Sequence, residues 1–242
     1  MIKVGLVGYG KAGRAVANVL SNDQRYSLQW ILRSRSGSDS MDGRPEIPVI
    51  GIDDIDLNKW LDENEVDALV DFSSADSIFR YGESIRKRNI MLVTAISAYS
   101  IEHIEFLRDL GNKIRVLSSP NITLGVNFLM LAAKLLRNIA PFADIEVVEQ
   151  HFREKPEISG TARKIAESLE LDEEKITSLR LGGIVGHHEV IFGFPNQTMR
   201  LVHESIRREA FGTGAAYALE ELAKCNNGFY SFEDLLMRKV FF

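Results

Sequence analysis

The stretch IKVGLVGYGKAG, residues 2–13, places glycines at positions 8, 10 and 13 directly after a short apolar run. The run at residues 2–7 predicts a β-strand, and residues 11–21 predict a helix that follows it at once. Glycines in such a connection let the backbone approach a pyrophosphate, whose charge then lies at a helix N-terminus. The motif predicts a dinucleotide site, and a glycine-rich turn without a ligand is the alternative. The expected cofactor-binding residues of this turn are Gly8, Gly10, Lys11, Ala12 and Gly13.

The first half of the chain alternates apolar runs with amphipathic segments. Strands are expected at residues 2–7, 27–33, 67–71, 90–94 and 114–118, and helices near 11–21, 56–63, 76–88 and 99–110. This alternation predicts βαβ units and a parallel sheet, that is, an α/β fold. Residues 34–48 are rich in Ser, Gly, Asp and Pro, so we expect them to form a surface loop.

The pattern changes after about residue 121. Residues 124–139 have the apolar spacing of a long, largely buried helix. Strands are then expected with few helices between them, at residues 143–151, 177–184, 187–194 and 198–206. This order predicts a second, mostly antiparallel sheet. Helices near 208–223 and 231–236 are expected to end the chain.

Composition narrows the classes of function. The 242 residues fit one large or two small domains. A net charge of -5 argues against a nucleic-acid binder. Cys225 is the only cysteine, which excludes an intrachain disulfide and a metal–thiolate cluster. The chain opens on a strand pattern rather than a signal peptide and has no apolar run of about 20 residues. We therefore expect a cytoplasmic protein that does not contact membranes.

The choice of dinucleotide depends on the residues about 20 positions after the glycines. An acidic residue there usually holds the ribose hydroxyl of NAD. This chain has Arg33, and the segment LRSRS around it contains no acidic residue before Asp39. The two guanidinium groups of Arg33 and Arg35 suit a 2′-phosphate. We therefore expect NADPH as the preferred cofactor, with NADH as a possible substitute; ordinary loop arginines are the alternative.

A second candidate site lies in EQHFREKPEISGTARKIAE, residues 149–167. His151 and Lys155 precede Ser159, Gly160 and Thr161, which open a predicted helix. The first N–H groups of a helix attract anions, and the nearby cations strengthen that attraction. Histidine also titrates near neutral pH and is a frequent proton donor. The pattern predicts a site for a carboxylate or phosphate with His151 as a catalytic acid, whereas a structural histidine is the alternative.

The remaining histidines are weaker candidates. His187 and His188 are adjacent on a predicted strand, so they point to opposite faces and form a poor metal pair. We expect a structural or interfacial role for both and no metal site. His203 is expected near the end of a strand. Its side chain could line a cleft or pack in the protein interior, and both alternatives stay open.

Several motifs together resemble the 4-hydroxy-tetrahydrodipicolinate reductase (dihydrodipicolinate reductase) family. The resemblance runs over nearly the whole chain, and its order of motifs is far more specific than the glycine turn alone. The motifs are GYGKAG at 8–13, VDFSSAD at 70–76, PNITLGVN at 120–127, EQHFREK and SGTA at 149–162, SLRLGGIVGHHEVIF at 178–192, HESIRREAFGTGA at 203–215 and GFYSFEDLL at 228–236.

The resemblance implies a fold and a reaction. The fold would be a Rossmann-type dinucleotide-binding domain, residues 1–121 plus 207–242. An inserted α+β domain, residues 122–206, would bind substrate and form oligomers through an open mixed sheet. The reaction would be reduction of a cyclic dicarboxylic imine derived from dihydrodipicolinate, in lysine and diaminopimelate biosynthesis. The expected partners are this small dicarboxylate and, because the family usually forms tetramers, three further copies of the chain.

Residue roles follow from the same resemblance. His151 matches the family's proposed general acid, and Lys155 matches the lysine of its motif. The helix start at Ser159, Gly160 and Thr161 matches the segment that holds one substrate carboxylate. The resemblance adds four cofactor-binding residues, Phe72, Thr94, Ser97 and Asn121.

Three departures from the family pattern lie in the expected substrate pocket. Phe152 replaces a second histidine, and phenylalanine cannot donate a hydrogen bond to a carboxylate. Ile96 stands where a threonine of a Gly-Thr-Thr-Gly loop is usual, and the link from Lys155 to Ser159 is one residue shorter. Two alternatives therefore stay open: a reductase of the same fold that acts on a different small imine carboxylate, and a non-catalytic NADPH-binding sensor.

Overall fold

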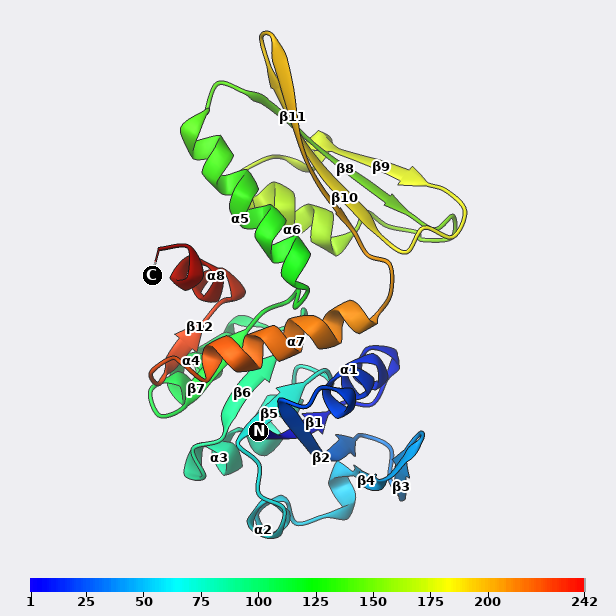
Figure 1. The fold of residues 1–242 in the computed structure, drawn as a ribbon, viewed down its shortest axis with the longest axis vertical. Coiled ribbons are helices and arrows are strands. Elements are labelled where there is room, and N and C mark those ends of the chain that lie inside the picture. Colours follow the sequence, from blue (N-terminus) through cyan, green and yellow to red (C-terminus); the bar gives the residue numbers. More distant parts are fainter. Residues whose placement is uncertain (242) are drawn as a thin grey trace. The chain divides into compact units, whose positions relative to one another are not determined.

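The computed structural model describes residues 1–241, and the chain divides into two compact units (Figure 1). The first unit contains the residues up to Ile122 together with those from Phe211 onward. The second unit contains Thr123–Ala210. The second is thus an insertion in the chain of the first.

The first unit is built on an eight-stranded sheet in the order β12-β7-β6-β5-β1-β2-β4-β3. All its neighbours pair in parallel except β3 and β4. The strands are β1 Ile2–Val7, β2 Tyr26–Arg33, β3 Ser38–Met41, β4 Arg44–Gly51, β5 Ala68–Asp71, β6 Met91–Thr94, β7 Arg115–Ser118 and β12 Gly228–Tyr230. The helices are α1 Lys11–Asn22, α2 Leu57–Glu63, α3 Ser77–Lys87, α4 Ile101–Gly111, α7 Glu209–Leu222 and α8 Phe232–Phe241, with a short 3₁₀ turn at Ile52–Asp54.

The central strands β1 and β5 are apolar on both faces, as a parallel sheet covered by helices requires. Val4, Leu6 and Leu69 are completely buried. β1 pairs with β2 on one side and with β5 on the other, so the order of strands reverses here. In open α/β sheets a ligand binds outside the carboxyl ends of the strands at this reversal. The predicted α/β class with a Rossmann-type parallel sheet is confirmed.

The prediction that residues 34–48 form a surface loop is wrong for most of this segment. β3 and β4 form an antiparallel hairpin, and β4 also pairs in parallel with β2. The segment has the polar composition of a loop, but Ile47 and Val49 alternate with polar or partly exposed residues and are buried. Asp42-Gly43 between the strands is a common hairpin turn. Pairing with β2 thus prevailed over local composition.

The second unit contains a four-stranded sheet in the order β11-β10-β8-β9. Its strands are β8 Asp144–His151, β9 Ile176–Arg180, β10 His187–Phe194 and β11 Gln197–Glu204, and its helices are α5 Leu124–Ile139 and α6 Gly160–Ser168, with a 3₁₀ turn at Glu173–Lys175. β10 pairs antiparallel with both neighbours, whereas β8 and β9 are parallel. The predicted mixed sheet is therefore confirmed. The core between sheet and helices includes Leu129, Val147, Ile165 and Phe192.

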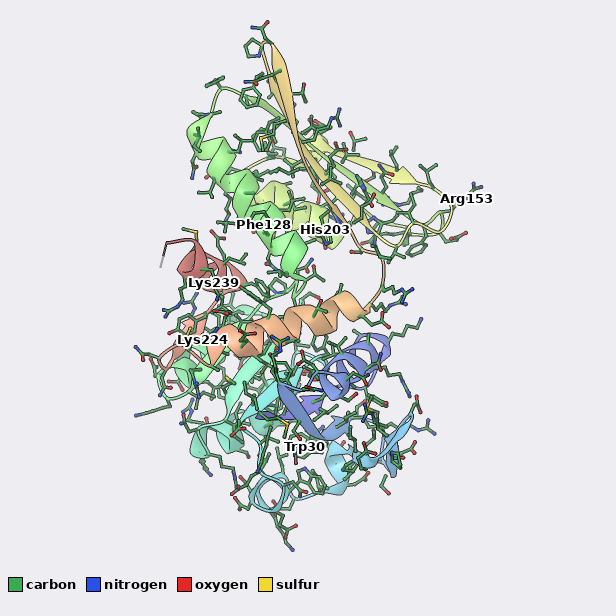
Figure 2. The ribbon with its side chains drawn as sticks, viewed as in Figure 1. Trp30, Phe128, Arg153, His203, Lys224 and Lys239 are labelled. Carbon is green, nitrogen blue, oxygen red and sulfur yellow. The ribbon has the colours of Figure 1, made fainter. Side chains whose placement is uncertain are left out.

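Helix α5 was expected to be largely buried, and this is wrong. Leu129 and Ala133 pack in the core of the second unit, but Phe128 is 57% exposed and Ile139 is 77% exposed. Figure 2 shows Phe128 on this helix. The apolar residues surround the helix, and one sheet face can cover only one side of it.

Strand β12 has no counterpart among the predicted elements. It contains only three residues, too few for a recognisable alternation, and it forms by pairing along β7. The last helix begins near its predicted start but extends to Phe241. Pairing with the edge of the sheet thus forms a strand from a segment whose sequence gives little indication of secondary structure.

Candidate functional site

A cavity of about 570 Å³ opens at the strand reversal of the first unit. It collects segments that follow the carboxyl ends of β1, β2 and β5. Its lining is Val7, Gly8, Tyr9, Gly10, Arg14, Arg33, Ser34, Arg35, Ile52, Phe72, Ser73, Ser74, Asp76, Ser77 and Arg80. Five residues predicted to bind cofactor therefore lie around one cavity: Gly8, Gly10, Arg33, Arg35 and Phe72.

Two glycines bring the start of helix α1 close to the end of β1 beside this cavity. Gly8 has φ +96, a conformation that favours glycine, and a Cβ there would lie 2.5 Å from the carbonyl carbon of Phe72. A Cβ on Gly13 would lie 2.0 Å from the carbonyl oxygen of Gly8. Helix α1 therefore begins pressed against the end of β1, which leaves its N-terminus directed at the cavity. These residues fit a dinucleotide pyrophosphate.

Arginines dominate the charge around the cavity. Arg33 bonds the carbonyl oxygens of Arg35 at 3.2 Å and Gly37 at 3.4 Å, so it shapes the turn after β2. Arg35 is exposed in that turn. Arg14 pairs with Asp42 at 2.6 Å, and Arg80 forms an ion pair with Asp53. The turn thus presents Arg35 to solvent while Arg33 holds the backbone that carries it.

The other six residues predicted to bind cofactor do not line the cavity. Lys11, Ala12 and Gly13 lie in the first turn of α1, behind the lining glycines. Thr94 is buried and shares a 2.7 Å hydrogen bond with the hydroxyl of Tyr99. Ser97 is exposed in the loop after β6, and the carbonyl oxygen of Asn121 accepts a bond from Ser119.

Sequence reasoning missed Arg14, Arg80 and the serines at 73, 74 and 77 as lining residues. Ser73 and Ser74 follow the carboxyl end of β5, and Ser77 begins α3. The strand predicted at residues 67–71 was therefore a usable signal, because ligands bind outside the carboxyl ends of parallel strands. Arg80 comes from helix α3 and carried no comparable signal. Ser73 is held by Asp71, which accepts bonds from its amide at 2.8 Å and its hydroxyl at 2.5 Å.

The second unit places His151 at the end of β8 beside a buried carboxylate. Glu149 lies two residues earlier on the strand, hence on the same face, and its side chain is completely buried. One of its oxygens bonds Nδ1 of His151. The other oxygen, Oε1, accepts bonds from Ser178 Oγ at 2.7 Å, Arg180 Nη2 at 2.7 Å and the Ser159 amide at 3.3 Å. Glu149 was absent from the predicted site.

Hydrogen bonds keep Glu149 ionised despite its burial. Burial alone would raise its pKa, but bonds from Arg180, Ser178, His151 and the Ser159 amide lower the pKa to about 2. The acid two positions before a histidine on a predicted strand was a usable signal, because such residues share a face. Arg180 comes from β9, which only the fold brings alongside.

Arg180 also fixes the loop that carries Lys155. Its Nε donates to the carbonyl oxygen of Lys155 at 2.9 Å, and its Nη2 donates to that of Glu157 at 2.7 Å. Lys155 is half-buried, whereas Arg153 is exposed in the same loop (Figure 2). Phe152 is 41% exposed. The structure therefore orders the backbone around Lys155 and leaves Arg153 in solvent.

The predicted helix start is the N-terminus of α6. Ser159 is buried at its N-cap, and Gly160 and Thr161 are its first helical residues. The hydroxyl of Ser159 is 2.9 Å from Nε2 of His188. The rings of His188 and His151 have their centres 5.3 Å apart. His151, Ser159, Gly160 and Thr161 thus gather at one end of the sheet, with His188 behind them.

Burial gives His188 an unusual titration. Burial, together with the nearby His151 and His203, lowers its pKa to about 3. In the described chain its Nδ1 has no hydrogen-bond partner. The unfolded chain binds a proton here below pH 6.5, whereas the folded chain stays neutral. Stability from this group is therefore full above pH 6.5 and is lost as the pH falls toward 3.

We expect His188→Gln to remove part of the acid sensitivity of the protein. Between pH 6.5 and 5 the wild type loses about 2 kcal/mol through His188, at 1.36 kcal/mol per pH unit. Glutamine does not bind a proton in this pH range, so the free energy of unfolding of the variant should depend less on pH. Urea unfolding at both pH values measures the difference. Equal losses in the two proteins contradict the expectation; His187→Gln, on the opposite face of the strand, is the matched control.

Two negative findings apply to residues 1–241. No three of their His, Cys, Asp and Glu side chains are arranged to bind a metal ion. No helix among them is long and apolar enough to cross a membrane.

Comparison with known proteins matches both units. The family model described as "Dihydrodipicolinate reductase, N-terminus" matches residues 2–122, and "Dihydrodipicolinate reductase, C-terminus" matches residues 122–236. The 4-hydroxy-tetrahydrodipicolinate reductase of Thermosipho africanus is 30% identical over 237 residues, which cover 97% of this chain and 98% of that protein. The protein of the same name from Alkaliphilus oremlandii is 33% identical over 210 residues, with 78% and 87% covered.

A solved structure has the same fold. The dipicolinate-bound dihydrodipicolinate reductase from Paenisporosarcina sp. TG-14 superposes with a TM-score of 0.81 at 22% identity, over 96% of this chain and 97% of that one. The two family models together match residues 2–236. The chain therefore belongs to the dihydrodipicolinate reductase family.

Proposed function

We propose that this protein reduces dihydrodipicolinate or its hydrated precursor, 4-hydroxy-tetrahydrodipicolinate, to tetrahydrodipicolinate, in the cytoplasm and with a nicotinamide cofactor. The observation that carries the proposal is the group formed by His151, Lys155 and the start of α6, in a chain of this family. The first unit would bind the cofactor, and the second would bind the substrate and form oligomers.

The cavity of the first unit supports the cofactor. Gly8 and Gly13 bring the backbone of β1 and the N-terminus of α1 to its floor, where a pyrophosphate can accept N–H bonds. A reduced nicotinamide bound in this unit would supply the hydride. The protein itself must hold that cofactor, supply the proton that accompanies the hydride and stabilise the negative charge that builds up on the substrate.

The second unit supports the binding of a small diacid. The first N–H groups of α6 have no acceptor within the helix and attract a carboxylate. Lys155 adds a positive charge on a backbone that Arg180 holds. These groups offset the negative charge that builds up as the substrate is reduced. His151 would then donate the proton that balances the hydride.

We propose NADPH as the preferred cofactor, because Arg35 is exposed beside the cavity on a turn braced by Arg33. Arg35→Ala is expected to raise the Kd for NADPH about 10-fold, the value of a charged hydrogen bond, and to leave that for NADH nearly unchanged. Titration of cofactor fluorescence measures both constants. Arg137→Ala, a surface arginine of the second unit, is the control. Equal weakening of both cofactors would refute the role of Arg35.

We also propose a homotetramer that forms through the outer face of the second sheet. Residues on this face alternate with the core residues of the same strands. It carries Val148, Ile191 and the 53% exposed Val202, beside an ion pair of Arg200 and Glu189. Exposed apolar side chains beside an ion pair whose arginine is 56% exposed are suited to a contact between copies of the chain.

A turnover assay tests the proposed activity. Pure protein is mixed with NADPH and enzymatically generated dihydrodipicolinate, and the absorbance of the reduced cofactor is followed. Turnover supports the proposal. Tight NADPH binding without turnover on this substrate refutes it.

The second candidate is the same chemistry on a different small imine carboxylate. The exposed Phe152 and the buried Ile96 favour it, because neither side chain can bind a carboxylate oxygen where the family has donors. Turnover on another imine acid, with none on dihydrodipicolinate, selects this candidate. NADPH binding without turnover on any imine acid selects a sensor.

A further inference from the structure

We propose that Glu149 is a positioning residue for His151: it holds Nδ1 protonated and so makes Nε2 the nitrogen that exchanges the catalytic proton. The inference rests on the proposed function, because it names the atom of His151 that acts in that reaction. It assigns a role to a buried carboxylate that does not touch the substrate itself.

The geometry assigns the two oxygens of Glu149 to different partners. Oε1 already accepts bonds from Ser178, Arg180 and the Ser159 amide. Within the described chain, the other oxygen, Oε2, has one hydrogen-bond partner, which is Nδ1 of His151. An ionised carboxylate has no proton to donate, so Nδ1 must be the donor. The neutral ring is therefore the Nδ1–H tautomer, and Nε2 carries the exchangeable proton only in the charged ring.

The opposite edge of the ring is the one left for the reaction. A Cβ on Gly186 would lie 3.2 Å from Nε2, so the absence of a side chain at this position leaves space beside that nitrogen. The side chain of His151 is only 10% exposed, and Glu149 is not exposed at all. Their contact is shielded from water, which strengthens its electrostatic part.

Other charged groups around His151 do not reproduce this effect. Arg180 on β9 is positive and already bound to Glu149, and a guanidinium cannot accept the Nδ1 proton. His188 on β10 stays neutral at physiological pH, and His203 on β11 lies beyond it. Lys155, in the adjoining loop, is a cation. Glu149 is thus the one carboxylate that contacts the ring within the described chain, and it is the acceptor that fixes the proton on Nδ1.

Glu149→Gln gives an unusually sharp test. The three donors at Oε1 will hold the amide oxygen of glutamine, which turns its NH₂ group toward Nδ1. That NH₂ donates, so the neutral ring should invert to the Nε2–H tautomer. Nitrogen-15 NMR of the histidine ring reads the tautomer directly, without substrate or turnover. We expect Nδ1–H in the wild type and Nε2–H in the variant.

The kinetic result should match the spectroscopic one. We expect kcat to fall about 10- to 100-fold, the usual effect of removing a group that orients a catalytic side chain, while the KM for NADPH stays within about 2-fold. Glu146→Gln is the matched control: it lies on the same strand and bonds Thr177 at the surface.

The outcomes separate the two proposals. A wild-type ring in the Nε2–H tautomer, or a tautomer unchanged by Glu149→Gln, overturns the role of Glu149 whatever the activity. Tautomer inversion in a protein that does not turn over dihydrodipicolinate instead overturns the proposed substrate only. If Glu149→Gln does not fold, Glu149→Asp keeps the charge beside Arg180 but withdraws it from Nδ1. The aspartate variant should then show a mixture of tautomers, and retention of pure Nδ1–H refutes the inference.

Discussion

His151→Ala is expected to lower kcat for reduction of dihydrodipicolinate at least ~100-fold at pH 7. Loss of a general acid costs about 10²- to 10⁴-fold. The neighbouring imidazole of His188, 5.3 Å away between ring centres, cannot replace it, because burial lowers its pKa to about 3. The dissociation constant for NADPH should stay nearly constant, because the cavity of the first unit is made of other residues. Stopped-flow absorbance for turnover and fluorescence titration for binding measure the two quantities.

A second histidine variant controls for the loss of an imidazole. His187 lies on the opposite face of its strand from His188 and is within 3.1 Å of Glu204. His187→Ala should keep activity within about 2-fold. Retention of more than a tenth of the activity in His151→Ala would show that the proton comes from another group or from water.

Gly13→Ala is expected to destabilise the protein by about 2 kcal/mol, the net of about 3 kcal/mol for overpacking a close contact and a smaller gain in helix propensity. Two effects compete at this position. Alanine favours a helix over glycine by about 1 kcal/mol. Its Cβ, however, would lie 2.0 Å from the carbonyl oxygen of Gly8, a backbone atom that cannot rotate away. The clash should prevail, lowering the thermal midpoint by roughly 4–8 °C and weakening cofactor binding as α1 moves.

Gly10→Ala is the matched control for stability. Nothing lies within 4 Å of a Cβ built at Gly10, and its φ of -80 suits any residue. The comparison uses calorimetry without cofactor, since Gly10 lines the cavity. A Gly13→Ala protein that is as stable as the wild type, or more so, would show that the close approach of α1 to β1 is absent.

The sequence alone determined the elements whose patterns are local. Strand β1, the glycine turn and helix α1 follow from an apolar run, glycines and helical spacing within 20 residues. The same holds for β8 and the start of α6, so His151, Ser159 and Gly160 could be predicted as one site. The motifs in their order also indicated the family.

The tertiary structure decided whatever depends on segments distant in the sequence. The hairpin of β3 and β4 formed because β2 offered an edge to a segment with a polar composition. β12 formed along β7 for the same reason. The Glu149 network needed Arg180 from β9, and the cavity needed Arg80 from α3. The apolar periodicity of a strand or helix depends on residues that are neighbours in the sequence. A buried charge, in contrast, is stabilised by partners that only folding brings within hydrogen-bond distance.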